Sequence, residues 1–245
     1  MVAMQKQLSA YVRMLPREIL EATDAIYLYG SMARGDVSFD SDCDLLIAIR
    51  DCDDKSFERL TKATEGWHTE LNCEFALYQI NTLKAMQKKG SLFLWHIKTE
   101  GIELFSNGEE LKGILAQLPA YNGGAEAISE YAEIMKDIDI DNTDETEVIN
   151  YNLSVMSTLI RNICIICSYE LGTPRFGRIS PVEVCAEYFG EQFPIDMQQY
   201  KMLYRYRVAV NRNKSMPHQA DIAQYYNDWK RKTKKLLSLA LSIVE

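Results

Sequence analysis

The chain has 245 residues, of which 47% are hydrophobic and 25% charged, and it carries a net charge of −8. These proportions exclude an intrinsically disordered protein, and the length allows one large domain or two small ones. No apolar run approaches the roughly 20 residues of a membrane-spanning helix, and the N-terminus lacks a charged-then-apolar signal segment, so we expect a cytoplasmic protein.

Strand patterns in the first half of the chain predict a small mixed sheet. The predicted strands are residues 25–29, 45–49, 71–79 and, as a short edge strand, 101–105. The first two are continuous apolar runs that are typical of buried strands, and the third alternates apolar with polar side chains. Helical patterns separate them at residues 5–23, where Pro16 leaves one helix or two short ones, at 55–65, and from 82 to 97.

After residue 121 the pattern becomes almost wholly helical. The predicted helices are residues 125–138, 145–171, 181–189, 197–211 and 221–244. Residues 139–147 are acidic and polar, so they form either a linker or the capped start of the long helix, with Thr143 and Thr146 as candidate caps. The predicted fold is therefore an α/β (α+β) domain with a small mixed sheet at residues 1–120, followed by an all-α helical bundle domain at 121–245.

Charge is unevenly distributed along the chain. Residues 1–150 carry 14 Lys and Arg against 27 Asp and Glu, a net charge of −13, whereas residues 151–245 carry 13 against 8, a net charge of +5. This asymmetry suggests two domains that meet across a cleft. The alternative is that each half has its own solvated face, because charge counts describe association rather than fold.

A glycine-serine turn and two spaced aspartates form the most informative stretch of the sequence. Gly30 and Ser31 end the first predicted strand, and Asp42 and Asp44 lie at the start of the second. A glycine lets the backbone come close to a ligand, and a turn that enters a helix presents N–H groups and a hydroxyl to phosphate. The two aspartates are two positions apart on a strand, so their carboxylates leave the same face and can share divalent ions. Glu74 can reach them from a neighbouring strand.

This set of groups suits phosphoryl transfer, in which catalysis is mostly positioning and neutralisation of charge on the phosphate oxygens. Two metals about 3.5–4 Å apart can stabilise the attacking and leaving oxygens together. Magnesium prefers carboxylates together with phosphate oxygens. We therefore expect two Mg²⁺ ions as cofactors and a nucleoside triphosphate that brings part of their coordination shell.

The spacing of these residues resembles that of the DNA polymerase beta-type nucleotidyltransferases. Their pattern is Gly-Gly or Gly-Ser, a gap of about ten residues, and Asp-x-Asp or Asp-x-Glu between hydrophobic residues. Gly30 and Ser31, followed after ten residues by Asp42 and Asp44, match it throughout. The resemblance implies that Gly30 and Ser31 hold the triphosphate and that Asp42 and Asp44 bind both metals.

Four further residues extend this resemblance. Arg34 and Ser41 make the stretch most similar to the small bacterial branch, which includes minimal and aminoglycoside nucleotidyltransferases, and both are assigned to nucleotide binding. A solvent-facing helix arginine is the alternative for Arg34. The third carboxylate is implied to support the metal that activates the attacking hydroxyl. We assign it to Glu74, which fits the strand phase, with Glu70 at the probable strand start as the alternative.

The helical second half resembles the four-helix domains, sometimes grouped as HEPN-like, that are paired with this branch. Arg212 and His218 match the Arg-Asn-x4-His spacing of HEPN ribonucleases, but Pro217 interrupts the segment and no tyrosine stands two places after His218. We expect a loop histidine and a solvated arginine there, not a ribonuclease. The basic run at residues 230–235 is likewise interpreted as the outer face of the last helix, so nucleic acid is not an expected partner.

Together these features predict an enzyme that transfers a nucleoside monophosphate, expected to be AMP from ATP, to a hydroxyl and releases pyrophosphate. The acceptor is a small molecule such as an aminoglycoside, which an acidic catalytic half would attract, or a protein. The acceptor proton would pass to Glu74, or to Glu145 or Glu147 near the domain junction. The alternatives are an antitoxin-like module that binds and nucleotidylates a partner protein, and a degenerate nucleotide-binding scaffold. The oligomeric state, including a homodimer, is left open.

Overall fold

The computed structural model describes residues 2–36, 42–71, 73–140 and 145–244. They divide into two compact units, Met1–Asn122 and Gly123–Glu245. Among the described helices, none is long and apolar enough to cross a membrane.

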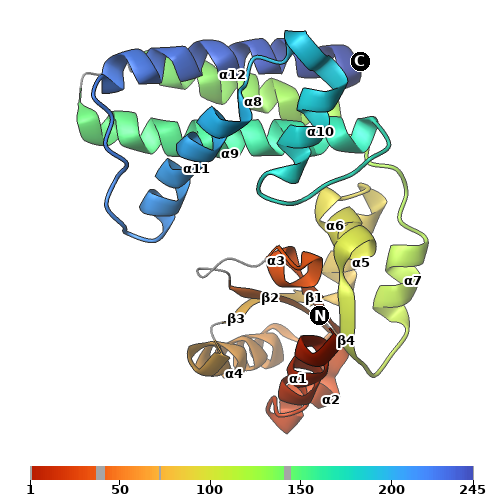
Figure 1. Cartoon of the computed structure of the whole chain (residues 1–245). Helices are drawn as coiled ribbons and strands as arrows, with labels where there is room; N and C mark the ends of the chain where they lie inside the picture. Colours follow the sequence, from red (N-terminus) through yellow and green to blue (C-terminus); the bar gives the residue numbers. More distant parts are fainter. Residues whose placement is uncertain (1, 37–41, 72, 141–144, 245) are drawn as a thin grey trace. The chain divides into compact units, whose positions relative to one another are not determined.

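The first unit is built on a four-stranded mixed sheet (Figure 1). Its strands are β1 Thr23–Tyr29, β2 Cys43–Ile49, β3 Cys73–Gln79 and β4 Ile102–Ser106, in the spatial order β3-β2-β1-β4. Strand β1 runs antiparallel to both β2 and β4, whereas β2 and β3 are parallel. The small mixed sheet predicted from the sequence is confirmed, with the last strand at an edge.

Helices cover both faces of this sheet. They are α1 Val2–Val12, α2 Arg17–Ala22, α3 Gly30–Arg34, α4 Asp54–Leu71, α5 Ile80–Lys88, α6 Leu92–Glu100 and α7 Glu110–Ala116. Alternate side chains of β2 enter two separate cores, because successive residues of a strand point to opposite faces. Leu45 and Ile47 join the core that contains Leu60 of α4, and Leu46 joins the core that contains Leu83 of α5. The continuous apolar run of β2 follows from this burial on both sides.

The boundary between α4 and β3 corrects the sequence prediction. The helix expected at residues 55–65 continues to Leu71, and the strand expected from residue 71 begins at Cys73. Trp67 packs against the core beneath the sheet, so the last turns of α4 bury apolar surface that the shorter prediction left out. Glu70 therefore lies in a helix and not at the start of the third strand.

Helix α7 was not predicted from the sequence, and a long-range contact supports its first turn. The buried Asp24 carboxylate of β1 accepts the backbone N–H of Glu110 at 3.3 Å and that of Leu111 at 2.9 Å. These are donors that a helix N-terminus otherwise leaves unpaired. A partner 86 residues away in the chain gives no local sequence signal.

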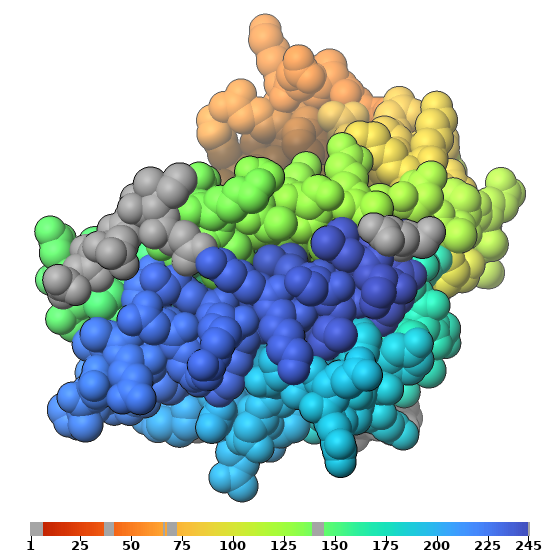
Figure 2. All heavy atoms as spheres, turned by 90° about the horizontal axis from the view of Figure 1, so that it is seen from above, coloured from red at the N-terminus to blue at the C-terminus, as the bar shows by residue number. Residues whose placement is uncertain are grey.

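The second unit is helical in its described parts. It contains α8 Gly124–Ile140, α9 Thr146–Glu170, α10 Ser180–Phe189, the short 3₁₀ helix η1 Gly190–Gln192, α11 Met197–Asn211 and α12 Ile222–Val244. The long helix α9 packs against α8, α10, α11 and α12, and most of its residues are buried. Helix α12 lies along one face of this unit beside α8 (Figure 2).

The start of α9 differs from the expected capped helix. Thr146 is its first helical residue rather than its cap, and the preceding Glu145 makes no capping hydrogen bond with its side chain. Thr143, the other cap candidate, lies outside the described residues. In contrast, Asp196 accepts hydrogen bonds from the backbone of Gln198 and Gln199, each at 2.9 Å, and so defines the start of α11.

Counting charge by structural unit removes most of the asymmetry seen along the sequence. Met1–Asn122 carries 13 Lys and Arg against 18 Asp and Glu, a net charge of −5, and Gly123–Glu245 carries 14 against 17, a net charge of −3. The strongly acidic stretch before residue 150 belongs to the helical unit. The contrast of −13 against +5 was therefore wrong as a description of two domains, because its dividing line cut through the second unit.

Candidate active site

Gly30 joins strand β1 to helix α3 in a conformation that glycine adopts most readily. Its φ is +71°, in the left-handed region where other residues are strained. A Cβ atom at this position would overlap the Asp44 carboxylate and lie 2.9 Å from its Cγ. The turn therefore brings backbone directly against an acidic side chain of the neighbouring strand. Ser31, the next residue, is buried.

Asp44 lies between two other polar side chains of the sheet. In the strand register it is opposite Tyr29 of β1 and opposite Glu74 of β3. Residues directly opposite each other share a face, so Tyr29, Asp44 and Glu74 form a row across three strands. Asp44 is half-buried and Glu74 is exposed. Two carboxylates side by side repel each other, and a shared cation would remove that cost.

The structure describes the three remaining candidates, Asp42, Ser41 and Glu70, to different extents. Asp42 immediately precedes β2 and is half-buried. Ser41 lies outside the described residues, so its assignment to nucleotide binding stays a prediction. The Glu70 side chain is also outside the described part, although its backbone belongs to α4.

Tyr29 forms an aromatic and electrostatic neighbour of the carboxylates. Burial raises the pKa of Tyr29 above its usual range, and the negative charges of Asp44 and Glu74 add to this effect. Its ring packs edge-on against Phe93, with centroids 5.7 Å apart, and against His96, with centroids 5.5 Å apart. The hydroxyl of Tyr29 is a hydrogen-bond donor next to Asp44 and Glu74, the two carboxylates that we call the acidic row.

The oxygen donors of this row fit a magnesium ion that arrives with a nucleotide. Among the described residues, no group of three or more His, Cys, Asp or Glu side chains is arranged to hold a metal by itself. Magnesium commonly binds through one or two carboxylates and completes its octahedron with substrate phosphates and water. Asp44 and Glu74 on adjacent strands supply such a partial set, and Asp42 lies two residues before Asp44.

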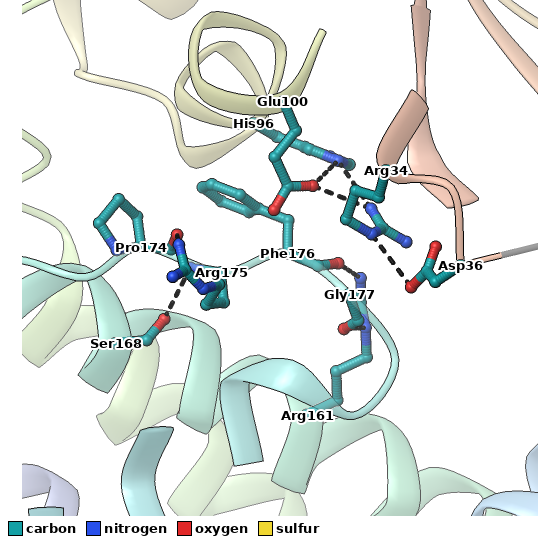
Figure 3. Close-up of polar contacts among 10 residues, drawn as sticks. All are labelled: Arg34, Asp36, His96, Glu100, Arg161, Ser168, Pro174, Arg175, Phe176 and Gly177. Atoms are coloured by element: carbon teal, nitrogen blue, oxygen red, sulfur yellow. Dashed lines mark hydrogen bonds and ion pairs between the residues drawn. The ribbon is translucent and has the colours of Figure 1, made fainter. Parts of the chain in front are cut away.

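Arg34 does not point freely into solvent, which was the alternative considered from sequence. It ends α3, and its Nη1 donates to Glu100 Oε2 of α6 at 2.9 Å, while its Nε donates to Asp36 at 3.2 Å (Figure 3). Glu100 Oε2 also lies 3.1 Å from Nε2 of His96. Burial of Glu100 opposes its ionisation, but the hydrogen bonds from His96 and Arg34 outweigh this and lower the pKa of that carboxyl. A contact between Arg34 and phosphate stays a prediction.

The other residues considered from sequence lie in the second unit. Glu145 and Glu147 are exposed at the start of α9. Arg212 is the half-buried C-cap of α11, and His218 is exposed in the loop before α12. The absence of ribonuclease activity stays a prediction.

A separate loop of the second unit is held by Arg161, which donates to the carbonyls of Phe176 and Gly177 at 2.6 and 3.0 Å (Figure 3).

Sequence reasoning did not single out Tyr29, His96 or Glu100. Tyr29 lies in an apolar strand pattern, and its neighbours on β2 and β3 become known only from the register. His96 and Glu100 are four residues apart on α6, a spacing that places them on one helix face. Their meeting with Arg34, more than 60 residues earlier, could not be inferred from that spacing.

The chain resembles known proteins in family and in fold. Residues 17–110 match the family model described as polymerase beta, nucleotidyltransferase. No curated protein matches the sequence. The crystal structure of spectinomycin adenyltransferase AAD(9) from Enterococcus faecialis, with ATP and spectinomycin, aligns with a TM-score of 0.53 at 15% identity, over 94% of this chain and 98% of that one.

Two further solved structures align over about half of this chain. A toxin-antitoxin structure with AMP-PNP has a TM-score of 0.34 at 15% identity, over 55% of this chain and 96% of that one. The tri-AMPylated Shewanella oneidensis HEPN toxin in complex with MNT antitoxin has a TM-score of 0.32 at 14% identity, over 56% and 97%. The alignment with the AAD(9) structure extends the likeness in fold across both units.

Proposed function

We propose that this enzyme transfers AMP from magnesium-bound ATP to a hydroxyl of a small molecule such as an aminoglycoside. The match of residues 17–110 to the polymerase beta nucleotidyltransferase model supports this class of reaction. Pyrophosphate is the second product. The observation that carries this proposal is the in-register row of Asp44 and Glu74 beside Gly30.

In this proposal Asp42, Asp44 and Glu74 hold the metal, and Gly30 and Ser31 hold the triphosphate. When bound, two Mg²⁺ ions neutralise charge on the phosphate oxygens and on the attacking and leaving oxygens. The acceptor oxygen forms a bond to the α-phosphorus as the bond to the bridging oxygen breaks, so pyrophosphate leaves.

Glu74 is the proposed acceptor of the proton that the attacking hydroxyl loses. It is the most exposed member of the acidic row, so a substrate hydroxyl can approach it from solvent. Glu145 and Glu147 are the alternatives, and they lie in the other unit. Because Glu74→Gln also removes a proposed metal ligand, the informative variants are Glu145→Gln and Glu147→Gln. Both should keep wild-type turnover if Glu74 takes the proton, and a large loss of turnover in either would assign the proton to that residue.

Two observations bear on the nature of the acceptor. AAD(9) was solved with ATP and spectinomycin, and its fold is shared over both units at only 15% identity. The first unit, Met1–Asn122, which we call the catalytic unit, has a net charge of −5. This charge favours a cationic acceptor, although less strongly than the −13 counted over residues 1–150. A protein hydroxyl is the other acceptor class to be assayed.

The test is release of pyrophosphate from ATP, GTP, CTP and UTP with Mg²⁺, measured across a panel of aminoglycosides and candidate protein acceptors. We expect activity with ATP and at least one aminoglycoside, loss of it with EDTA, and a product heavier than the acceptor by one AMP in the mass spectrum. Transfer to proteins alone would support the antitoxin-like alternative. No transfer from any nucleotide to any acceptor would refute the proposed function.

A further inference from the structure

Arg34, His96 and Glu100 form a charged cluster inside the catalytic unit that the proposed reaction does not use directly. The side chains of Arg34, His96 and Glu100 are 16%, 13% and 10% exposed. One oxygen of Glu100 lies 2.9 Å from Arg34 Nη1 and 3.1 Å from His96 Nε2. A charged pair so far removed from water is held in one geometry, because breaking it leaves an uncompensated charge.

The cluster reaches the acidic row through two routes, both visible in the contacts. Arg34 is the last residue of α3, and Gly30 at the other end of this five-residue helix packs against the Asp44 carboxylate. His96 packs edge-on against Tyr29, which is opposite Asp44 in the sheet. Glu100 therefore connects to the Gly30 turn through Arg34 and to Tyr29 through His96.

Building on the proposed function, we propose that Glu100 is a positioning residue for nucleotidyl transfer, acting through Arg34 and His96 to hold α3 and Tyr29 against Asp44. The same contacts give Arg34 a positioning role in addition to its proposed contact with phosphate. Its guanidinium anchors α3 to α6, so its contribution to the reaction includes placement of the Gly30 turn and not only contact with phosphate. A small displacement of reacting groups costs a large factor in rate, and the cluster is suited to prevent it.

The test compares Glu100→Gln with Glu110→Gln, a control for loss of one negative charge at a more exposed ion pair. Both changes remove one negative charge from a cross-helix ion pair of the same unit, but the Lys84–Glu110 pair joins α5 to α7, away from α3. We expect Glu100→Gln to lower kcat by about tenfold or more while KM for ATP changes less. Backbone amides of α3 should exchange with solvent at least about tenfold faster than in wild type. Glu110→Gln should leave kcat and the α3 amides unchanged.

Arg34→Lys provides a second test should Glu100→Gln fold poorly, and it is read from α3 exchange and from Mn²⁺ binding without nucleotide, because Arg34 is also assigned to phosphate contact. It retains the positive charge but loses the planar fork that can bond Glu100 and Asp36 together. The same fall in kcat and faster α3 exchange are expected, together with weaker Mn²⁺ binding measured by electron paramagnetic resonance. Equal kcat and equal α3 exchange in wild type and both variants would overturn the positioning role. Inactive wild type with every nucleotide would instead refute the proposed function.

Discussion

At the scale of single residues, the Gly30–Asp44 contact constrains which residue can occupy position 30. A positive φ alone favours glycine, and the Asp44 carboxylate occupies the space that any side chain at this position would need. The acidic row adds a second constraint, because Asp44 and Glu74 are like charges in adjacent strands. A cation bound between the two carboxylates would offset their repulsion.

Asp44→Asn should remove nucleotidyl transfer and leave the fold intact. The change is nearly isosteric, but it removes the charge that the proposed metal needs. The activation barrier should rise by about 3 kcal/mol or more, which lowers the rate at least roughly a hundredfold. Repulsion from Glu74 is lost as well, so the melting temperature without magnesium should stay the same or rise. Pyrophosphate release and thermal unfolding are the measurements, with Glu58→Gln on the exposed face of α4 as the control. Near-wild-type turnover in Asp44→Asn would contradict the metal-carboxylate assignment.

Gly30→Ala should impair both stability and activity. Alanine at a φ of +71° is strained, and its Cβ forces Asp44 out of position, so we expect a loss of about 1–3 kcal/mol in the free energy of unfolding. Gly172→Ala is the matched control, because it also has a positive φ, +74°, but a Cβ there meets no atom within 4 Å. Urea unfolding should show a larger loss for Gly30→Ala, and activity should fall only in that variant. Equal stability losses would show that the overlap with Asp44 relaxes at no cost.

At the scale of elements, those defined by interactions between residues close in sequence were predicted, and those that depend on distant residues were not. The bounds of α11 were predicted from helical spacing, and the structure adds the local cap at Asp196. The strand at Leu45–Ile49 was found because burial on both sides leaves an unbroken apolar run. Helix α7, supported by Asp24 from a distant strand, was missed. The carboxylates of the candidate site could be proposed from spacing, but their alignment with Tyr29 depends on strand register and could not.

The edge strand β4 offers a pH-dependent test of this sheet. Tyr27 of β1 lies opposite Glu103 of β4 and donates to its carboxylate at 3.1 Å. Burial, and then the charge of Glu103, raise the pKa of Tyr27 to about 12. Because the unfolded chain ionises at an ordinary pKa of about 10, the stability that this tyrosine contributes is complete below pH 10 and is lost as pH rises toward 12.

Tyr27→Phe should therefore flatten the fall in unfolding free energy between about pH 10 and 12. Other tyrosines with a raised pKa, such as Tyr225, contribute equally to both proteins and cancel in the comparison. Urea unfolding at a series of pH values measures the effect, and absorbance of tyrosinate checks that Tyr27 is the group lost. Parallel curves for wild type and Tyr27→Phe would show that Tyr27 ionises normally in the folded protein.

At the scale of the whole molecule, the fold of the first unit is complete without residues beyond Asn122. Its sheet, both layers of helices and the candidate carboxylates Asp42, Asp44 and Glu74 all come from Met1–Asn122. The helical unit supplies Glu145 and Glu147 but no member of the acidic row. The proposed binding of metal and triphosphate therefore needs residues of the first unit alone.

Limited proteolysis tests whether the two units are the two domains predicted from the sequence. We expect the first cleavage near residues 122–124, where the chain passes from one unit to the next, or at residues 139–144, which the sequence marks as acidic and polar. Strand β2 should resist, because Leu45–Ile49 is buried between two layers of helices and paired on both sides, so a protease reaches it only after the sheet unfolds. Mass spectrometry of the early fragments identifies the sites. Early cleavage within β2 would contradict the central position of that strand and, with it, the placement of Asp44 in a rigid sheet.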